Sequence, residues 1–294
     1  MSGIININEP FSEKYTLIIE TDMRAVNIAA YSRARIRWDF RVLRVAPEEL
    51  EVELIRLDNV LLEATNPLTK EVQQVSDVFG RMYNELHLVL DRHGQVLRIL
   101  NLDIILDKWA TVKEEMQQHI EHTPEIKDVI LLNDELFQSQ EKVITAIQHN
   151  EFFMLYFNHL YGNYFPFRAK REQQYNFFNT AMLQMQFGGH LVSEGSHTVQ
   201  LEISGTPLFG LGGFTRKAYA QFADQLPLHK LAPEIADNSN YLLDKKTGKV
   251  LEAARQKYEI ADEKNLYLKL DYHFLSEEKY RERLKMQPAF YAPV

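Results

Sequence analysis

Residues 33–42 read RARIRWDFRV, in which charged and apolar side chains alternate along the whole stretch. A period of two is the pattern of a β-strand that buries one face and exposes the other. The apolar members are Ala34, Ile36, Trp38, Phe40 and Val42. The phase slips at Leu43-Arg44-Val45, which indicates a strand end or a β-bulge. This stretch therefore predicts a sheet with one face packed on a core.

Similar strand patterns continue on both sides of it. The candidates are YTLIIETD (15–22), LEVELIRL (50–57), LHLVLDRHGQVLRI (86–99, a hairpin), TAMLQMQF (180–187), HTVQLEIS (197–204), NYLLDKKTGKVLEAARQKYEI (240–260, a hairpin) and NLYLKLDYHFL (265–275). The two hairpins share an Asp before the turn and a Gly at its end, a position that often needs positive φ. This echo indicates either an internal duplication or turn chemistry alone.

Residues 101–161 are predicted to be helical. Apolar side chains recur at helical spacing over 102–116, and Asn101 just before them is a good N-cap residue. Thr123-Pro124-Glu125 has the composition of a second helix start. A third helical pattern runs over 136–160. Shorter helices are expected at 69–80, 215–225 and 276–285.

These elements predict an α+β protein with about ten strands. The strands form either two similar antiparallel sheets or one curved, half-barrel-like sheet, packed against the central helices. We divide the chain into an N-terminal sheet region (1–100), a central helical segment (101–161) and a C-terminal sheet region ending in a helix (162–294), within one compact unit. This layout resembles that of lipoprotein-carrier proteins, half-barrels plugged by helices, although no motif is shared.

Composition limits the function. The 294 residues are 45% apolar and 25% charged, as in ordinary folded proteins, and the net charge of −8 argues against nucleic acid or anionic membranes as partners. The chain has no cysteine, which excludes disulfides, zinc–thiolate sites and cysteine nucleophiles. The sequence has neither a signal peptide nor a membrane-spanning apolar run. We therefore expect a soluble, cytoplasmic protein, although a chain trimmed of a leader would read the same way.

The exposed face of the strand predicted over 33–42 carries a row of arginines: Arg33, Arg35, Arg37 and Arg41. Such a row can bind phosphate or an acidic partner. It can also be neutralised by Asp39 and by Glu51 and Glu53 of the next strand, in cross-strand pairs worth about 0.2–1 kcal/mol each. Neutralisation is favoured, because exposed charge ladders usually keep a sheet face soluble.

Residues 161–178, YGNYFPFRAKREQQYNFF, mix aromatic and basic side chains. Tyr, Phe and Arg are enriched at protein interfaces, and aromatic rings also stack on unpaired bases. Packing of a helix end on a sheet is the third interpretation, and the acidic chain disfavours nucleic acid. The candidate partner-binding residues are Tyr161, Tyr164, Phe165, Phe167, Arg168 and Arg171.

The glycine-rich stretch GTPLFGLGGFTRK (205–217) is a candidate anion site, because backbone N–H groups in such loops can hold a phosphate. It lacks the Gly-Lys-Ser/Thr ending and a complete GxGxxG motif, so a turn or mobile loop is the alternative. The candidate anion-binding residues are Gly210, Gly212, Gly213, Arg216 and Lys217.

Catalytic and metal motifs are weak. Glu115, His119 and His122 share one helix face, but their polar neighbours indicate a wet helix end, and no metal or cofactor is predicted. Ser196-His197 has no nucleophile elbow around it. His93 lies in a hairpin turn, where it is interpreted as a turn residue. No catalytic residue is assigned.

The sequence therefore favours a non-enzymatic binding protein: an adaptor, a chaperone-like protein or an immunity-type factor. It would bind a protein partner, itself or a small apolar ligand. A carrier of apolar ligands predicts a deep cavity lined by the inward side chains of 180–187 and 266–274. The alternative is an enzyme that acts on a phosphate-bearing or other anionic substrate near Gly210–Lys217.

Overall fold

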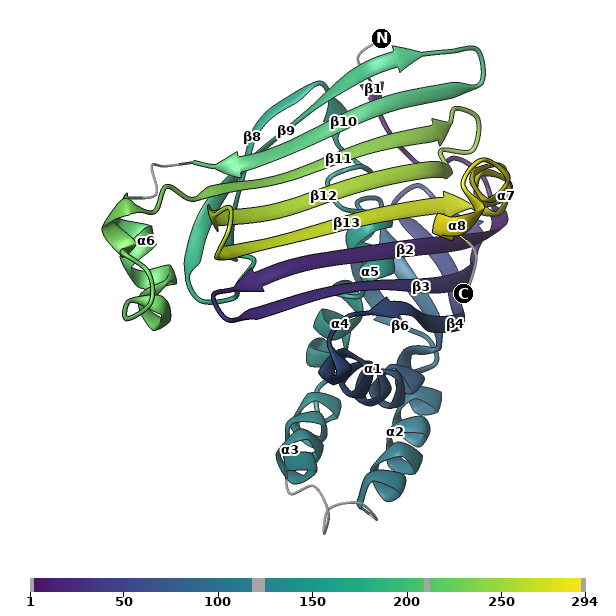
Figure 1. The fold of residues 1–294 in the computed structure, drawn as a ribbon. Helices are drawn as coiled ribbons and strands as arrows, with labels where there is room; N and C mark the ends of the chain where they lie inside the picture. The colour runs from purple at the N-terminus through teal and green to yellow at the C-terminus, as the bar shows by residue number, and fades with distance from the viewer. Residues whose placement is uncertain (1–2, 118–124, 209–211, 292–294) are drawn as a thin grey trace.

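A computed structural model describes residues 3–117, 125–208 and 212–291 of the chain. In this part of the chain the main sheet is antiparallel and has eleven strands (Figure 1). They are β2 (Phe11–Ala25), β3 (Ile28–Val45), β4 (Glu49–Ala64), β5 (Glu85–Asp91), β6 (Val96–Ile99), β8 (Phe167–Tyr175), β9 (Met182–Glu194), β10 (Thr198–Pro207), β11 (Glu234–Asp244), β12 (Val250–Asp262) and β13 (Leu266–Ser276). A small second sheet pairs β1 (Gly3–Ile4) with β7 (Tyr164–Phe165).

The strand order in the main sheet is β6-β5-β4-β3-β2-β13-β12-β11-β10-β9-β8. Strands β2 and β13 pair along their length, from Tyr15 opposite Ser276 to Ala25 opposite Leu266. The first and last thirds of the chain therefore form one continuous sheet, which decides between the two arrangements predicted from the sequence.

The helices are α1 (Pro67–Gly80), α2 (Leu102–Gln117), α3 (Glu125–Phe137), α4 (Gln140–Gln148), α5 (Glu151–Tyr156), α6 (Gly212–Ala218), α7 (Glu277–Met286) and α8 (Pro288–Tyr291), with short 3₁₀ turns at Arg81–Tyr83, Ala220–Phe222 and Leu228–Lys230. Helix α5 lies on one face of the sheet, called the inner face here, and α7 and α8 lie on the other, the outer face (Figure 1). Helices α2, α3 and α4 form an arm that projects from the sheet. Within the described residues, no helix has the length and apolar character needed to cross a membrane.

The core is aromatic and is centred on α5. Phe152 and Tyr156 of this helix stack on each other, and both meet Phe40 and Phe274 of the sheet. Tyr15 joins them and donates its hydroxyl hydrogen bond to the carbonyl of Val250 at 2.8 Å. The helix acts as a plug for the concave side of the sheet, because its rings fill the space between strands from both ends of the chain.

The strand predictions are confirmed. Ile36, Trp38, Phe40 and Val42 are buried on the inner face, and the predicted irregularity is a register shift between Val42 and Arg44. Both hairpin turns end on glycines with positive φ, +82° at Gly94 and +76° at Gly248. In each turn an aspartate, Asp91 or Asp244, accepts backbone N–H groups of the turn.

The helical middle differs from its prediction in two places. The pattern over 136–160 is interrupted, because Ser139 and Asn150 cap separate helices, α4 and α5, with their side-chain oxygens. Asn101 does not use its side chain as a cap. It accepts from the N–H of His87 and donates to the carbonyl of Glu85, which ties the start of α2 to β5. Thr123 and Pro124 lie outside the described residues.

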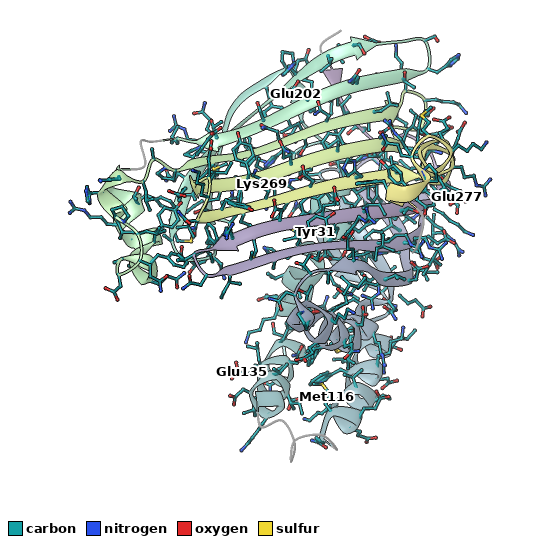
Figure 2. All side chains as sticks on the ribbon, in the orientation of Figure 1. Tyr31, Met116, Glu135, Glu202, Lys269 and Glu277 are labelled. Carbon is teal, nitrogen blue, oxygen red and sulfur yellow. The ribbon has the colours of Figure 1, made fainter. Side chains whose placement is uncertain are left out.

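The arginine row on β3 is neutralised, as favoured from the sequence. Arg41 contacts Asp39 at 2.8 Å and Glu53 at 3.4 Å, and Arg44 contacts Glu51 at 3.3 Å. The sequence did not reveal two further partners. Asp58 pairs with Arg35 and Arg37, and Glu63 with Arg33. Figure 2 shows how densely charged and polar side chains cover the outer face, for example around Tyr31, Lys269 and Glu202.

Candidate functional sites

The segment that leaves α5 and enters β8 contains the predicted partner-binding residues. Tyr161 and Phe165 are each 1% exposed, and Tyr161 donates its hydroxyl to the carbonyl of Gly248 at 2.7 Å. These two side chains belong to the core, because the segment crosses the inner face on its way to the sheet edge. Tyr164 is 54% exposed, Phe167 is half-buried and Arg171 is exposed. The side chain of Arg168 lies outside the described residues.

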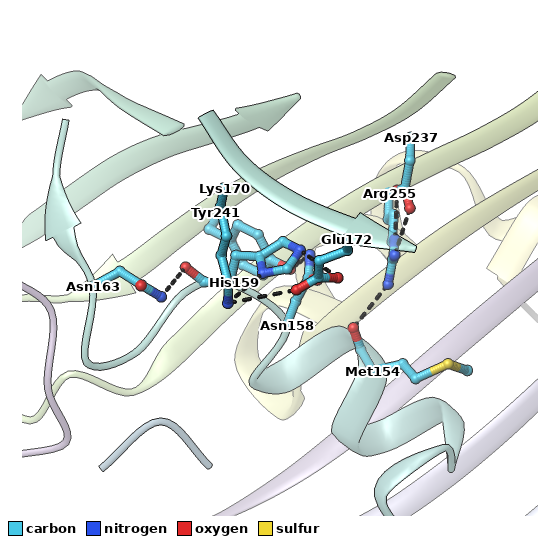
Figure 3. Close-up of polar contacts among 9 residues, drawn as sticks. All are labelled: Met154, Asn158, His159, Asn163, Lys170, Glu172, Asp237, Tyr241 and Arg255. Carbon is cyan, nitrogen blue, oxygen red and sulfur yellow. Dashed lines mark hydrogen bonds and ion pairs between the residues drawn. The ribbon is translucent and has the colours of Figure 1, made fainter. Parts of the chain in front are cut away.

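His159 is the centre of a polar cluster in the same segment (Figure 3). Its ring nitrogens lie 3.1 Å from the ammonium of Lys170 and 3.5 Å from a carboxylate oxygen of Glu172, both on β8. Burial, followed by the charges of Lys170 and Arg255, lowers the pKa of His159 to about 4. The imidazole is therefore neutral at pH 7, where its Nδ1 accepts from Lys170 and its Nε2 donates to Glu172.

A buried ion pair ties the plug helix to the sheet. Arg255 of β12 donates to both carboxylate oxygens of Asp237 on β11, at 2.8 and 2.7 Å. Its third hydrogen bond goes to the carbonyl of Met154 in α5, at 2.8 Å (Figure 3). Burial alone would raise the pKa of Asp237, but the Arg255 guanidinium holds it below its usual value. This pair is a structural anchor, because all of its partners are internal.

Two further charged side chains follow Arg255 on the inner face of β12. Glu259 is fully buried and accepts hydrogen bonds from the Asn176 amide, the Tyr219 hydroxyl and the backbone N–H groups of Phe177 and Phe178. Lys257 lies between Arg255 and Glu259 on the strand, with its ammonium 4.7 Å from the centre of the Phe177 ring. The sequence does contain a signal for this row: charged residues alternate at the inward positions of β12, where apolar ones are expected.

The glycine-rich candidate anion site is only partly described. Gly210 lies outside the described residues, and Gly212 and Gly213 begin the short helix α6. Arg216 and Lys217 are exposed on that helix. Anion binding here stays a prediction. The helix face with Glu115, His119 and His122, where no metal was predicted, is also only partly described: Glu115 pairs with Arg81 at 2.8 Å, and His119 and His122 lie outside the described residues. Among the described residues, no cluster of three His, Asp or Glu is placed to hold a metal ion.

The deep apolar cavity expected for a carrier of apolar ligands is filled where residues 180–187 would line it. Of its expected lining, Leu183, Met185 and Phe187 are buried in the main core. In the second stretch expected to line the cavity, 266–274, Leu268 and Leu270 are only partly buried. A cavity of about 220 Å³ lies elsewhere, between residues 3–8 and β9, β10 and β11, with Leu201, Leu243 and Glu194 among its lining.

A cavity of about 410 Å³ is an open groove on the helical arm. Its lining comes from α3 and α4: Leu132, Glu135, Leu136, Lys142, Thr145, Ala146 and His149. Leu132 is 66% exposed, although leucine is among the residues most often buried in folded proteins. The sequence pattern over 136–160 placed a helix here, but nothing in it distinguished an open apolar face from a covered one.

The arm is also the acidic part of the molecule. Residues 102–148 contain ten Asp and Glu, four Lys and no Arg, a net charge of −6 against −8 for the whole chain. Two of the lysines are paired, Lys113 with Asp134 at 2.5 Å and Lys108 with Glu85 at 3.3 Å. Glu135 projects from α3 at the groove (Figure 2). The groove therefore combines exposed apolar side chains with one acid, Glu135, and one base, Lys142, on an arm whose net charge is negative.

Comparisons with known proteins leave the family open. No protein-family model matches the chain, and no curated protein matches it. Among solved structures, the chain is similar to one of lipovitellin that describes its lipid–protein interactions, with 8% identity and a TM-score of 0.38. The match covers 91% of this chain and 25% of that one. Similarity at this level assigns neither a family nor a ligand.

Proposed function

We propose that the chain is a non-enzymatic protein-binding protein whose α3–α4 groove receives an amphipathic, basic helix of a partner. The observation that carries the proposal is Leu132, which is exposed on the wall of the 410 Å³ groove within the acidic arm. Exposed apolar surface rimmed by polar groups is the usual mark of an interaction site.

The spacing of the lining residues suits a helix. Leu132 and Leu136 are one turn apart on α3, and Lys142, Ala146 and His149 follow one face of α4. A groove between two helices accepts a third whose apolar anchors recur at the same spacing. The arm is held to the rest of the molecule by aromatic contacts, including the stacking of Tyr83, outside the arm, on Phe137 of α3, so the groove is formed before a partner arrives.

The charge of the arm selects the partner. Glu135 lines the groove, and Glu141 precedes the lining residue Lys142 in the sequence. Within the negatively charged arm, a helix with lysine or arginine beside its apolar face is attracted and an acidic helix is repelled. Such attraction accelerates association and weakens as salt is added.

A synthetic peptide tests the groove directly. The probe is a fluorescein-labelled helix of about 18 residues, five turns, with leucines on one face and lysines on the other. Fluorescence anisotropy measures its affinity for the wild-type chain and for Leu132→Glu. We expect at least about a tenfold loss in the variant, because the new carboxylate would be desolvated in the groove. A version of the peptide with glutamate in place of lysine should not bind.

Leu131→Glu is the matched control. Leu131 is 54% exposed on the same helix but does not line the groove, so the variant adds the same charge at a neighbouring position. Its affinity should remain within about twofold of the wild type. Equal losses in the two variants, or no loss in Leu132→Glu, would show that binding is a general effect of the acidic surface.

The surface predicted from residues 161–171 is proposed as a second contact, now reduced to Tyr164, Phe167 and Arg171. Self-association is its simplest use, because Tyr and Arg are typical of interfaces. Native mass spectrometry should show a dimer that is lost in Tyr164→Ala. A monomeric wild-type protein at micromolar concentration would remove this surface from consideration.

A further inference from the structure

The plug helix covers only part of the inner face. In Figure 1, β13, β2 and β3 continue beyond α5 towards α6. The inward side chains of this extension are partly buried rather than buried: Thr21, Met23, Ala30, Ser32, Leu268 and Leu270. Apolar and hydroxyl groups at these positions are therefore partly exposed to solvent.

Lys257 lies at the border of this uncovered face. The register of the sheet places it opposite Asp237 on one side and Leu270 on the other, and Leu270 is opposite Thr21. Its side chain starts from the inner face because Arg255 and Ala253, two and four residues earlier, are inward as well. The lysine is thus next to the partly open apolar surface.

The charge of Lys257 has no direct counter-ion. Within the described part of the chain, no carboxylate oxygen lies within 4.0 Å of its ammonium. The nearest acidic neighbours are both engaged, Asp237 by Arg255 and Glu259 by its hydrogen-bond donors. Burial, followed by the charge of Arg255, lowers the pKa of Lys257 to about 8. The Phe177 ring, 4.7 Å from the ammonium, and the charge of Asp237 compensate this cation only in part, and an anion from outside would stabilise it further.

We infer that Lys257 binds the carboxylate of a single-chain apolar acid whose body lies along the inward side chains of β13 and β2, beside Leu268 and Leu270. A head group with one negative charge matches the single charge of Lys257. A doubly charged phosphate would meet Asp237 and Glu259 as well as the lysine, and is disfavoured for that reason. The inference concerns the sheet and is independent of the groove on the arm.

Dodecanoate is the probe, and isothermal titration calorimetry is the measurement. The variant Lys257→Met keeps the length of the side chain and removes its charge. We expect it to fold, because the wild-type ammonium is destabilised by burial, and to bind dodecanoate at least about tenfold more weakly. Lys269→Met is the matched control: this lysine is on the outer face of β13 (Figure 2) and its loss should leave the affinity unchanged.

Three further measurements separate the contribution of the ligand's head group from that of its alkyl chain. In the wild type the affinity for dodecanoate should fall by about tenfold per pH unit above pH 8, because the binding form of Lys257 is the protonated one. Dodecyl phosphate should bind more weakly than dodecanoate. Leu270→Gln should weaken dodecanoate binding without altering its pH dependence. Absence of binding, or equal binding by Lys257→Met and the wild type, would overturn the inference.

Discussion

On the outer face of the sheet, the arginines of β3 each meet a carboxylate on the same or the next strand, whereas the acidic side chains of the helical arm outnumber its lysines more than twofold. The two regions also differ in how far their apolar side chains are buried. The sheet buries its aromatic residues around α5, and the arm leaves Leu131 and Leu132 exposed.

This difference separates stability from recognition. Neutralised charges and buried rings have no capacity left for a partner, so the centre of the sheet is where substitutions should unfold the protein. The surplus charge and open leucines of the arm add little to folding and remain available for binding. Lys257 differs from the other charges of this interior, since no carboxylate of the described residues lies within ion-pair distance of its ammonium.

The largest expected effect is in the plug. Phe152→Ala should reduce the free energy of unfolding by about 3–5 kcal/mol, because it leaves a cavity among Trp38, Phe40 and Tyr156. Urea denaturation followed by circular dichroism measures this. Leu132→Ala on the arm should change the free energy of unfolding by less than about 0.5 kcal/mol. Similar losses for both substitutions would contradict the proposed division between the regions.

The buried ion pair should come next. Asp237→Asn leaves the Arg255 guanidinium buried without its counter-ion and should cost about 3–5 kcal/mol in the same assay. The arm offers a solvent-accessible comparison in Lys113 and Asp134. Lys113→Met should cost about 1 kcal/mol or less. If Asp237→Asn is as mild as Lys113→Met, the pair does not anchor α5.

The pH dependence of stability should be governed by His159. Because its pKa is about 4 in the folded protein and near the ordinary 6.5 in the unfolded chain, the unfolded chain binds more protons between these values. The contribution is therefore complete above pH 6.5 and is lost as pH falls towards 4, by about 3 kcal/mol in total. Urea midpoints measured from pH 7 to 4.5 should show this slope, and His159→Gln should remove most of it.

The smallest effect is expected on the arginine row. Arg41→Gln removes a partly exposed member of the ladder, and Asp39 keeps its hydrogen bond from the Ser12 hydroxyl, so the free energy of unfolding should change by about 1 kcal/mol or less. The same substitution should also leave peptide binding by the arm unaffected. A marked loss of either would show that the row is more than a neutralised surface.

Much of the architecture could be predicted locally. The strand over 33–42, the turns at Gly94 and Gly248 and the hairpin of β11 and β12 are governed by side-chain alternation and by backbone conformation, which neighbouring residues determine. The burial of Tyr161 and Phe165 could not be read in this way, because a mixture of aromatic and basic residues has the same composition in a core crossing and at an interface. The exposure of Leu132 was hidden for a similar reason, since helical spacing does not say which face finds a partner.

The amino-acid sequence by itself determined that this is an antiparallel α+β protein with helices in its middle, since periodicity and turn chemistry are local properties. Only the tertiary structure decided that β2 and β13 close both halves into one sheet, that α5 plugs it and that Lys257 faces the Phe177 ring, with no ion-pair partner among the described residues. Those features depend on contacts between residues far apart in the chain. A charge, in particular, is matched or unmatched only after its neighbours in space are known.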